Sequence, residues 1–386
     1  MALLFDLGAL NEPQTDRALN QIYKALHTHD GDDSIWNPHE SPFVRRLIEL
    51  FTQRGLMRLD GFRAELEKWL AGEKHRPGTV PARPDGAMQR WTEGERELVK
   101  LYLEALPPAE WTLDDNMLMV DYLVQRYLPA DDLRTEAEWL ATRATLMGRV
   151  QASMEALNAK QADTVLAALP STVDEAAQFL PLTPLQVNVM RFGAARAAEN
   201  VQKLADDARH RMRNVIRQHT EEQMLAGHGE APRPSHSLQT TLLDEFATLN
   251  RDWRRIAVTE AGENANQGYV SSQKPGTKLK RVEQYRNACA FCRKIDGKVV
   301  EVVAADAPKK DGDTQIWPGK TNIGRSAAPR KRVGNTLVER EPDERWWIAA
   351  GVQHPHCRGR WLPVIQDEPG DDTDFGNWLR QTLETK

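Results

Sequence analysis

The stretch NACAFCRKIDGKVV, residues 287–300, holds two of the three cysteines in this chain of 386 residues. The third cysteine lies in HPHCRGRW, residues 354–361, where His354 stands three positions before Cys357. A CxxC turn presents two thiolates to one tetrahedral centre, and a second pair of ligands completes such a site. The spacing therefore predicts a structural zinc site with three cysteines and one histidine as ligands: Cys289, Cys292, His354 and Cys357.

The second histidine of the HPHC motif, His356, is adjacent to Cys357 and is therefore less well placed to share a metal ion with it. The 61 residues between the two ligand pairs, 293–353, form a much longer loop than that of a zinc finger. Zinc ribbons tolerate such insertions because the metal supplies the closure energy. Four protein ligands leave no open position for water, so the expected Zn²⁺ is structural.

Two other interpretations of the cysteines remain open. A CxxC pair can be a redox centre, although such a pair is expected beside a βαβ pattern, which the sequence does not show. Free cysteines are also commonly buried as small hydrophobic side chains. The clustering of all three cysteines in one polar, basic and loop-rich region favours the metal site over both.

The composition is ordinary for a globular protein, with 40% hydrophobic and 28% charged residues and a formal net charge of −5. The charge is uneven, because residues 271–360 contain 19 Lys and Arg against 10 Asp and Glu. We therefore expect a basic C-terminal module on an acidic body. No apolar run approaches the roughly 18 residues of a membrane span. The start MALLFDLGALNEP lacks the basic region of a secretory signal, so we expect no membrane partner and a reducing compartment.

The first two-thirds of the chain show helical periodicity, with linker-like breaks at 76–86 and 227–237. The expected fold class is a mainly α N-terminal body with long helices, followed by a small α+β C-terminal module that zinc staples. We divide the chain into an N-terminal helical region at 1–75, a helical body at 88–227 and a C-terminal domain at 238–386.

The longest expected helix covers 184–226, about 40 residues without an interrupting proline. Thr183 is a good N-cap, Pro184 suits the first helical position and Gly227 is a good C-terminal stop. The apolar stripe of this helix is thin and rich in alanine. It therefore either packs against partners along one side or extends as an arm.

Other element boundaries follow from capping residues, glycines and alternation. Thr112 is expected to cap a helix, and a break is expected at Gly55–Gly61. Two separate helices are expected at 238–250 and 251–270. KVVEVVA, residues 298–304, alternates well enough for a strand.

Three motifs follow one another in the last third of the chain: RRIAVTEAGENANQGYV at 254–270, CAFCRKIDGKVV at 289–300 and HPHCRGRW at 354–361. Their order and spacing resemble the phage Mu F-like minor head protein family, also called the head morphogenesis family. Its members carry a helical stretch ending near RIARTE, a cysteine pair followed by Asp-Gly, and HPNCRC near the end. The matching positions are Arg255, Ile256, Ala257, Thr259 and Glu260; Cys289, Cys292, Asp296 and Gly297; and His354, Pro355, Cys357 and Arg358.

The chain departs from the family pattern at three positions. Val258 stands where the family often has arginine, His356 replaces an asparagine, and Gly359 replaces the last cysteine. The family's last cysteine is therefore not a necessary ligand in this chain.

The resemblance implies a structural component of the virion rather than an enzyme. Such a minor capsid protein acts in head assembly in the host cytoplasm, and its expected partners are the portal protein and the major capsid protein. It would lie in the phage head near packaged DNA. The basic runs KPGTKLKRVEQYR (274–286) and PRKRVGN (329–335) could neutralise DNA phosphates without sequence preference. A solvated loop face is the alternative interpretation of these runs.

A zinc-containing DNA-processing enzyme such as a nuclease is the main alternative function, and a zinc-stabilised regulatory DNA-binding protein is a third. A nuclease needs a histidine base and further metal ligands. No histidine lies between Cys292 and His354, or after His356. PGKTNIGRS, residues 318–326, contains GKT, but Thr314 stands where a Walker A loop needs glycine.

Two further groups are expected to be architectural. Glu260 is expected to pair with a nearby arginine such as Arg254, because buried carboxylates are normally paired. Trp346, Trp347 and Trp361 bracket the HPHC turn, and we expect them to form the small core over which the zinc ligands close. An exposed aromatic surface for a partner is the alternative.

Overall fold

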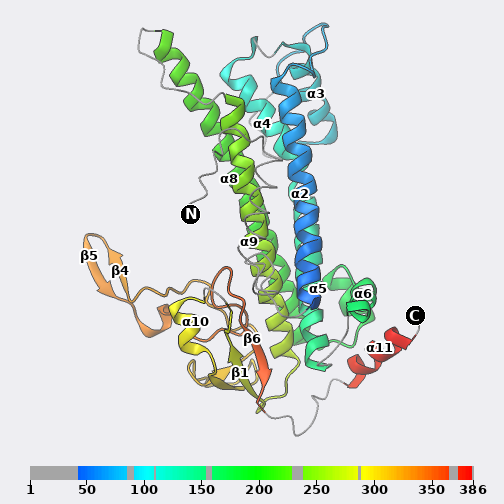
Figure 1. Ribbon diagram of the computed structural model, residues 1–386, viewed down its shortest axis with the longest axis vertical. Coiled ribbons are helices and arrows are strands. Elements are labelled where there is room, and N and C mark those ends of the chain that lie inside the picture. Colours follow the sequence, from blue (N-terminus) through cyan, green and yellow to red (C-terminus); the bar gives the residue numbers. More distant parts are fainter. Residues whose placement is uncertain are drawn as a thin grey trace, which may run out of the picture. The chain divides into compact units, whose positions relative to one another are not determined.

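The computed structural model describes residues 42–84, 91–107, 110–153, 159–227, 238–285, 288–364 and 373–384. The first 41 residues of the expected N-terminal region, and residues 228–237 of the expected linker, lie outside this range. The described chain has long helices up to residue 271 and a small α+β module after it (Figure 1). This confirms the expected arrangement of a mainly α body and an α+β C-terminal module.

The helices are α2 (Pro42–Leu70), α3 (Glu93–Ala105), α4 (Leu113–Tyr127), α5 (Ala130–Ser153), α6 (Ala159–Ala168), α7 (Val173–Phe179), α8 (Pro184–Gly227), α9 (Leu238–Ser271), α10 (Ala290–Ile295) and α11 (Thr373–Glu384). The strands are β1 (Lys278–Val282), β2 (Val299–Val302), β3 (Gln315–Ile316), β4 (Arg330–Val333), β5 (Thr336–Glu339) and β6 (Arg360–Pro363), with a 3₁₀ helix, η3, at Pro342–Glu344. None of the described helices combines the length and the apolar character that crossing a membrane requires.

Contacts divide the chain into two compact units, each built from separate segments. Among the described residues, the first unit draws on 52–133 and 199–253, and the second unit draws on 42–51, 134–198 and 254–384. The boundaries fall inside α2, α5, α8 and α9. Each of these four long helices therefore contributes to both units, and neither unit is one continuous stretch of the chain.

Two of the predicted helix caps are present as reciprocal capping boxes. The backbone N–H of Asp115 donates to the Thr112 hydroxyl at 3.3 Å, and the Thr112 N–H donates to the Asp115 carboxylate at 2.9 Å. Thr183 and Gln186 make the same exchange at 3.3 and 2.9 Å. These bonds satisfy N–H groups that the first turn leaves without helical partners, and they confirm the predicted starts of α4 and α8.

The predicted break at Gly55–Gly61 is wrong, because α2 continues through both glycines. A Cβ atom on Gly55 would lie 1.9 Å from the Trp253 ring, and one on Gly61 would lie 2.7 Å from the Tyr127 ring. These glycines admit large aromatic side chains against the helix surface. Their role is packing within the first unit, which the local sequence does not distinguish from helix termination.

The prediction of two helices over 238–270 is also wrong, because α9 is continuous. No glycine or proline stands at the expected junction, and the buried apolar stripe passes across it without a change of phase. Leu242, Phe246, Leu249 and Trp253 are all buried, at helical spacings of three and four residues.

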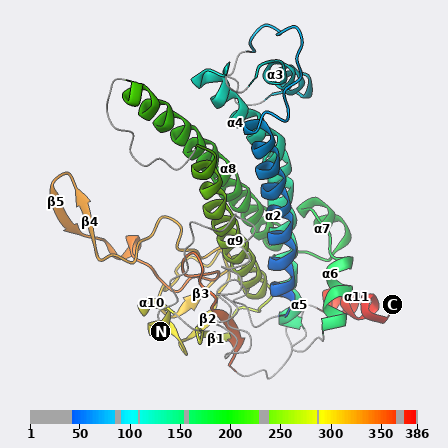
Figure 2. The same ribbon diagram turned by 45° about the horizontal axis from the view of Figure 1, so that its top comes forward.

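The module after α9 contains a four-stranded sheet in the order β3-β2-β1-β6. β1 pairs antiparallel with β2 and with β6, and β2 pairs parallel with β3. The predicted strand at 298–304 is confirmed as β2. One face of the sheet packs on the end of α9, and Figure 2 shows the strands beside that end of the helix. The shared core includes Leu279, Val300, Val302, Ile316 and Trp361 from the strands and Tyr269 and Val270 from α9.

Two glycines let α5 and α9 approach closely within the second unit. A Cβ atom on Gly148 would lie 1.9 Å from the carbonyl oxygen of Ala265, and one on Gly268 would lie 2.0 Å from that of Thr145. The neighbouring atoms are backbone, which cannot rotate out of the way. The same part of α9 supplies the side chains that hold the candidate site described below.

We expect Gly268→Ala to lower the free energy of unfolding by about 1–3 kcal/mol, because the added methyl group overpacks a backbone contact. Thermal and denaturant unfolding would measure the loss. Gly376→Ala is the matched control, since no atom lies within 4 Å of its added Cβ and alanine favours a helix over glycine. Equal stability of Gly268→Ala and the wild type would contradict the close helix contact.

Candidate metal centre

The CxxC pair is positioned by the first turn of α10. Cys289 is the N-cap of this helix, and its thiol accepts a hydrogen bond from the Cys292 N–H at 3.4 Å. The cap and the helix therefore place both sulfur atoms on the same side of the turn. Cys292 is fully buried, whereas Cys289 is partly exposed.

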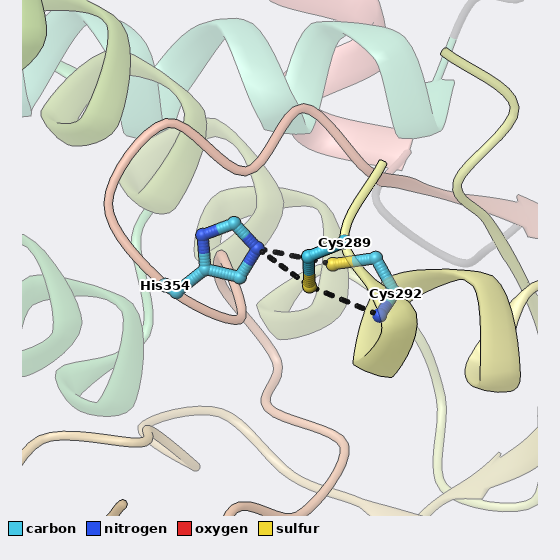
Figure 3. A group of neighbouring side chains, drawn as sticks. All are labelled: Cys289, Cys292 and His354. Atoms are coloured by element: carbon cyan, nitrogen blue, oxygen red, sulfur yellow. Dashed lines mark hydrogen bonds between the residues drawn. The ribbon is translucent and has the colours of Figure 1, made fainter. Parts of the chain in front are cut away.

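His354 faces this pair from a loop 62 residues further along the chain (Figure 3). Its Nε2 atom lies 3.3 Å from the Cys289 sulfur and 3.2 Å from the Cys292 sulfur. Its Nδ1 atom lies 2.7 Å from the carbonyl oxygen of Pro355. Because a carbonyl can only accept, Nδ1 carries the hydrogen, and the Nε2 lone pair faces the two sulfurs. Metal-bound histidines are oriented in this way.

An aromatic side chain fixes the plane of the histidine ring. Trp346 stacks on His354 with ring centroids 5.6 Å apart and an interplanar angle of 13°. Phe291 of α10 packs edge-on against Trp346, with ring centroids 5.4 Å apart. The prediction that Trp346, Trp347 and Trp361 form the small core under the ligands is wrong, because that cluster consists of Ala288, Cys292, Val352 and Cys357. Trp346 stacks on the predicted ligand, Trp347 packs edge-on against Trp317 and Trp361 lies in the core of the sheet.

Cys357 completes the predicted set from the same loop as His354. Its N–H donates to the His354 carbonyl at 3.0 Å, which closes the turn. Its sulfur is fully buried and lies 4.0 Å from the Cys292 sulfur. Cys289, Cys292 and His354 form one group that could hold a metal ion, and Cys357 joins the cluster through Cys292.

His356 is separated from this cluster by the shape of its turn. Its backbone has a φ of 66°, in the left-handed region that non-glycine residues rarely adopt. Its N–H donates to the Thr259 hydroxyl of α9 at 3.1 Å. The groups of metal-ligand atoms found among the described residues include His354 and not His356.

The cluster also contains two charged residues that sequence reasoning missed. Arg281 and Glu283 are fully buried and form an ion pair at 2.7 Å. Arg281 donates to the Cys357 sulfur at 3.5 Å, and the Glu283 carboxylate lies 3.6 Å from the same sulfur. Glu283, Cys292 and Cys357 form a second group that could hold a metal ion.

The sequence signal for the burial of Arg281 and Glu283 is the two-residue alternation of a strand with one buried face. Leu279 and Arg281 alternate with the exposed Lys278 and Lys280 along β1, and Glu283 continues the buried parity just after the strand. The many charged residues of KPGTKLKRVEQYR suggest a basic surface run, so the alternation of buried and exposed positions is easily missed. Arg281 lies inside the module and is not part of that surface.

The pKa values of Cys357 and Cys292 are shifted in opposite directions. Burial would raise the pKa of the Cys357 thiol, but the hydrogen bond with Cys292 and the positive charge of Arg281 lower it to about 6. The hydrogen bond with Cys357, together with burial, raises the pKa of Cys292. Without a metal ion, Cys357 is therefore the thiolate of the pair and Cys292 is the thiol that donates to it.

The loop that carries His354 and Cys357 is held by side chains of α9. Glu263 accepts a hydrogen bond from the Val352 N–H at 2.6 Å, and Asn266 donates to the Gly359 carbonyl at 2.9 Å. With Thr259, three positions on successive turns of one helix bind this loop. They belong to the motif at 254–270, so this motif supports the site from outside.

Glu260 is paired as expected, but its partner comes from α8. Arg196 donates to the Glu260 carboxylate at 2.7 Å and also pairs with Glu263 at 3.2 Å. The prediction of Arg254 as the partner of Glu260 rests on closeness in the sequence alone. The tertiary contact between α8 and α9 supplies a different arginine.

Comparison of the chain with family models, with curated protein sequences and with solved structures gives no match. The residues themselves therefore carry the chemical argument. Three thiols and an oriented imidazole nitrogen, gathered in a mostly buried cluster, form a donor set for a soft or borderline metal ion. A metal ion bound by all four residues would have no open position for water.

We expect the metal-free protein to show one thiolate that appears as the pH rises through about 6. Above its pKa, Cys357 loses its proton while Cys292 keeps its own. Ultraviolet absorbance of the thiolate would follow the titration. Cys357→Ser should abolish this step, and Cys289→Ser should leave it in place. A first step near the ordinary pKa of cysteine, about 8.5, would contradict the assigned role of Arg281 and Cys292.

Proposed function

We propose that this chain is a structural minor head protein of a phage or prophage. It would act in head assembly, bound to the portal protein or the capsid interior near packaged DNA, in the virion and in the host cytoplasm during assembly. Its C-terminal module would be closed by one structural Zn²⁺ held by Cys289, Cys292, His354 and Cys357. Its role would be to bind partners and not to catalyse a reaction.

The observation that carries the proposal is the meeting of three motifs that lie far apart in the sequence. Thr259, in the motif at 254–270, binds the backbone of the HPHC turn. The sulfurs of Cys289 and Cys292, in the motif at 289–300, lie 3.3 and 3.2 Å from Nε2 of His354 in the third motif. The motifs whose order and spacing produced the family resemblance are thus parts of one compact arrangement. This supports a common structural role for them.

The choice of zinc rests on donor chemistry. Thiolates with imidazole suit Zn²⁺, and a four-ligand set of this kind is usual for structural sites. The thiol-rich part of the core is made of small side chains, namely Ala288, Cys292, Val352 and Cys357. Such a core buries little apolar area, so a metal ion would supply much of the closure energy.

The setting near DNA is supported by exposed positive charge on the same module. Lys278 and Lys280 are exposed along β1, and Arg330 and Arg332 are exposed along β4. Each phosphate contact adds affinity that weakens with salt and carries no sequence preference. Sequence-selective binding would instead favour a regulatory DNA-binding protein.

We expect the purified protein to contain about one zinc per chain and to lose it in Cys292→Ser, because each ligand pair alone holds the ion weakly. Elemental analysis would measure the content. Thermal melting with and without a chelator should show the C-terminal module losing stability, with Gly94→Ala in α3 as a control outside that module. A metal-free protein that melts identically with the chelator would contradict the zinc staple.

We expect particles isolated from cells that carry the gene to contain this chain in far fewer copies than the major capsid protein. Quantitative mass spectrometry of purified heads would measure the ratio, and cross-linking would identify the neighbour. The nuclease alternative predicts divalent-metal-dependent DNA cleavage by the purified protein. Cleavage that His354→Ala abolishes, or absence of the chain from complete heads, would argue against the head-protein function.

A further inference from the structure

We propose that Glu283 is a fifth donor of the metal centre, able to bind the ion in place of His354. This inference rests on the metal centre proposed above and adds a ligand that the cysteine and histidine spacing does not include. The chemical class of the ligand is a carboxylate, and the bound species is the same divalent cation. The consequence is a centre that keeps its ion when the histidine leaves.

The first support is the position of the carboxylate. Both oxygens of Glu283 lie 3.6 Å from the Cys357 sulfur. An oxygen of Glu283 and the sulfurs of Cys292 and Cys357 all lie within 4.8 Å of one another. The two candidate ligand groups therefore share Cys292. An ion next to that sulfur would belong to both groups and could therefore be bound by His354 or by Glu283.

The second support is the space made for the carboxylate. Gly359, two residues after Cys357, has no side chain, and a Cβ atom there would lie 2.1 Å from Glu283 Oε1 and 2.5 Å from Oε2. The carboxylate lies flat against this backbone position. Any other residue at 359 would push it away from the thiols, so the chain holds it beside them.

The third support is electrostatic. Glu283 and Cys357 are both fully buried, and a metal-bound cysteine is deprotonated, so the charges that the two residues bring to a bound ion must be balanced by cations that contact both. Arg281 does so from one side, through its 2.7 Å contact to Glu283 Oε1 and its 3.5 Å contact to the sulfur. The guanidinium is fixed in that place by the Gly351 carbonyl at 3.2 Å and by the Trp361 ring. A metal ion bound to Cys357 and Glu283 would be the second cation that contacts both groups.

Burial separates the roles of the two donors. His354 is partly exposed, and the stacking of Trp346 and one backbone contact hold its ring. Glu283 is enclosed. His354 is therefore the outer, exchangeable donor, and Glu283 is the inner donor that remains with Cys292 and Cys357.

The test is a double-variant cycle on zinc affinity, measured by competition with a chromophoric chelator for the wild type, His354→Ala, Glu283→Gln and the double variant. Glutamine keeps an oxygen that accepts from Arg281 but is a poor metal donor. We expect Glu283→Gln to weaken binding less than about 10-fold in the wild type and more than about 100-fold in the His354→Ala background. A supporting residue typically contributes about 10–100-fold, with the same loss in both backgrounds. Equal losses would therefore overturn the proposal.

A second variant keeps the proposal testable if the buried Arg281 tolerates no substitution of Glu283. Gly359→Ala retains Glu283, but the added Cβ, 2.1 Å from Oε1, displaces the carboxylate from the thiols. We expect Gly359→Ala to weaken zinc binding less than about 10-fold in the wild type and more than about 100-fold in the His354→Ala background, whereas a supporting role would give about the same loss in both. Gly94→Ala is the control, because nothing lies near its added Cβ. Equal losses of Gly359→Ala in the two backgrounds would overturn the proposal.

Failure of the zinc centre and failure of this inference have different signatures. A wild-type protein that binds neither zinc nor cobalt overturns both. A wild-type protein that binds one ion, with equal losses in the two backgrounds, leaves the centre intact and removes only the role of Glu283.

Discussion

The carboxylate of Glu263 joins the cysteine-bearing loop to the helices of its unit. It accepts a hydrogen bond from the Val352 N–H at 2.6 Å and pairs with Arg196 of α8 at 3.2 Å. A buried carboxylate is costly unless it is both paired and hydrogen-bonded, and here α8 supplies the charge while the loop supplies the N–H. Gly351 makes the approach possible, since a Cβ atom there would lie 1.9 Å from the carboxylate. The loop that carries His354 is therefore fixed against α9 at Gly351 and Val352.

The two cores of the C-terminal module differ in how much apolar surface they bury, and only one of them borders a group of side chains that could hold a metal ion. The sheet core contains large apolar side chains such as Ile316, Ile348 and Trp361, and it is closed by α9. The thiol core contains four small buried residues and borders the Arg281–Glu283 ion pair. Hydrophobic burial scales with apolar area, at about 25 cal/mol per Å², so the second core gains little from it. The ligand bonds of a metal ion would supply further closure energy there.

The sequence correctly predicts the long helix α8, two helix caps, strand β2 and the thiol–histidine cluster, because local rules govern each of them. Thr112 and Thr183 cap helices through side chains three residues away, and CxxC spacing acts within one turn. Prediction fails where a partner distant in sequence sets the role of a residue. Gly55 looks like a helix breaker until Trp253 is placed against it. Glu283 looks like a surface charge until Gly359 makes room for it, and no local pattern records that pairing.

The predicted metal ligand His354 is linked through Trp346 to the most extended feature of the module. Trp346 stacks on the histidine, and its backbone N–H and ring N–H donate to the carbonyls of Ser326 and Arg325 at 3.1 and 3.2 Å. Those residues lead into the β4–β5 hairpin, which projects from the four-stranded sheet (Figure 1). A lone two-stranded ribbon is marginally stable, so its direction depends on this base. In the proposed head protein, the direction of the basic strand β4 would therefore depend on how His354 is held. The metal centre would then orient a binding surface as well as close a loop.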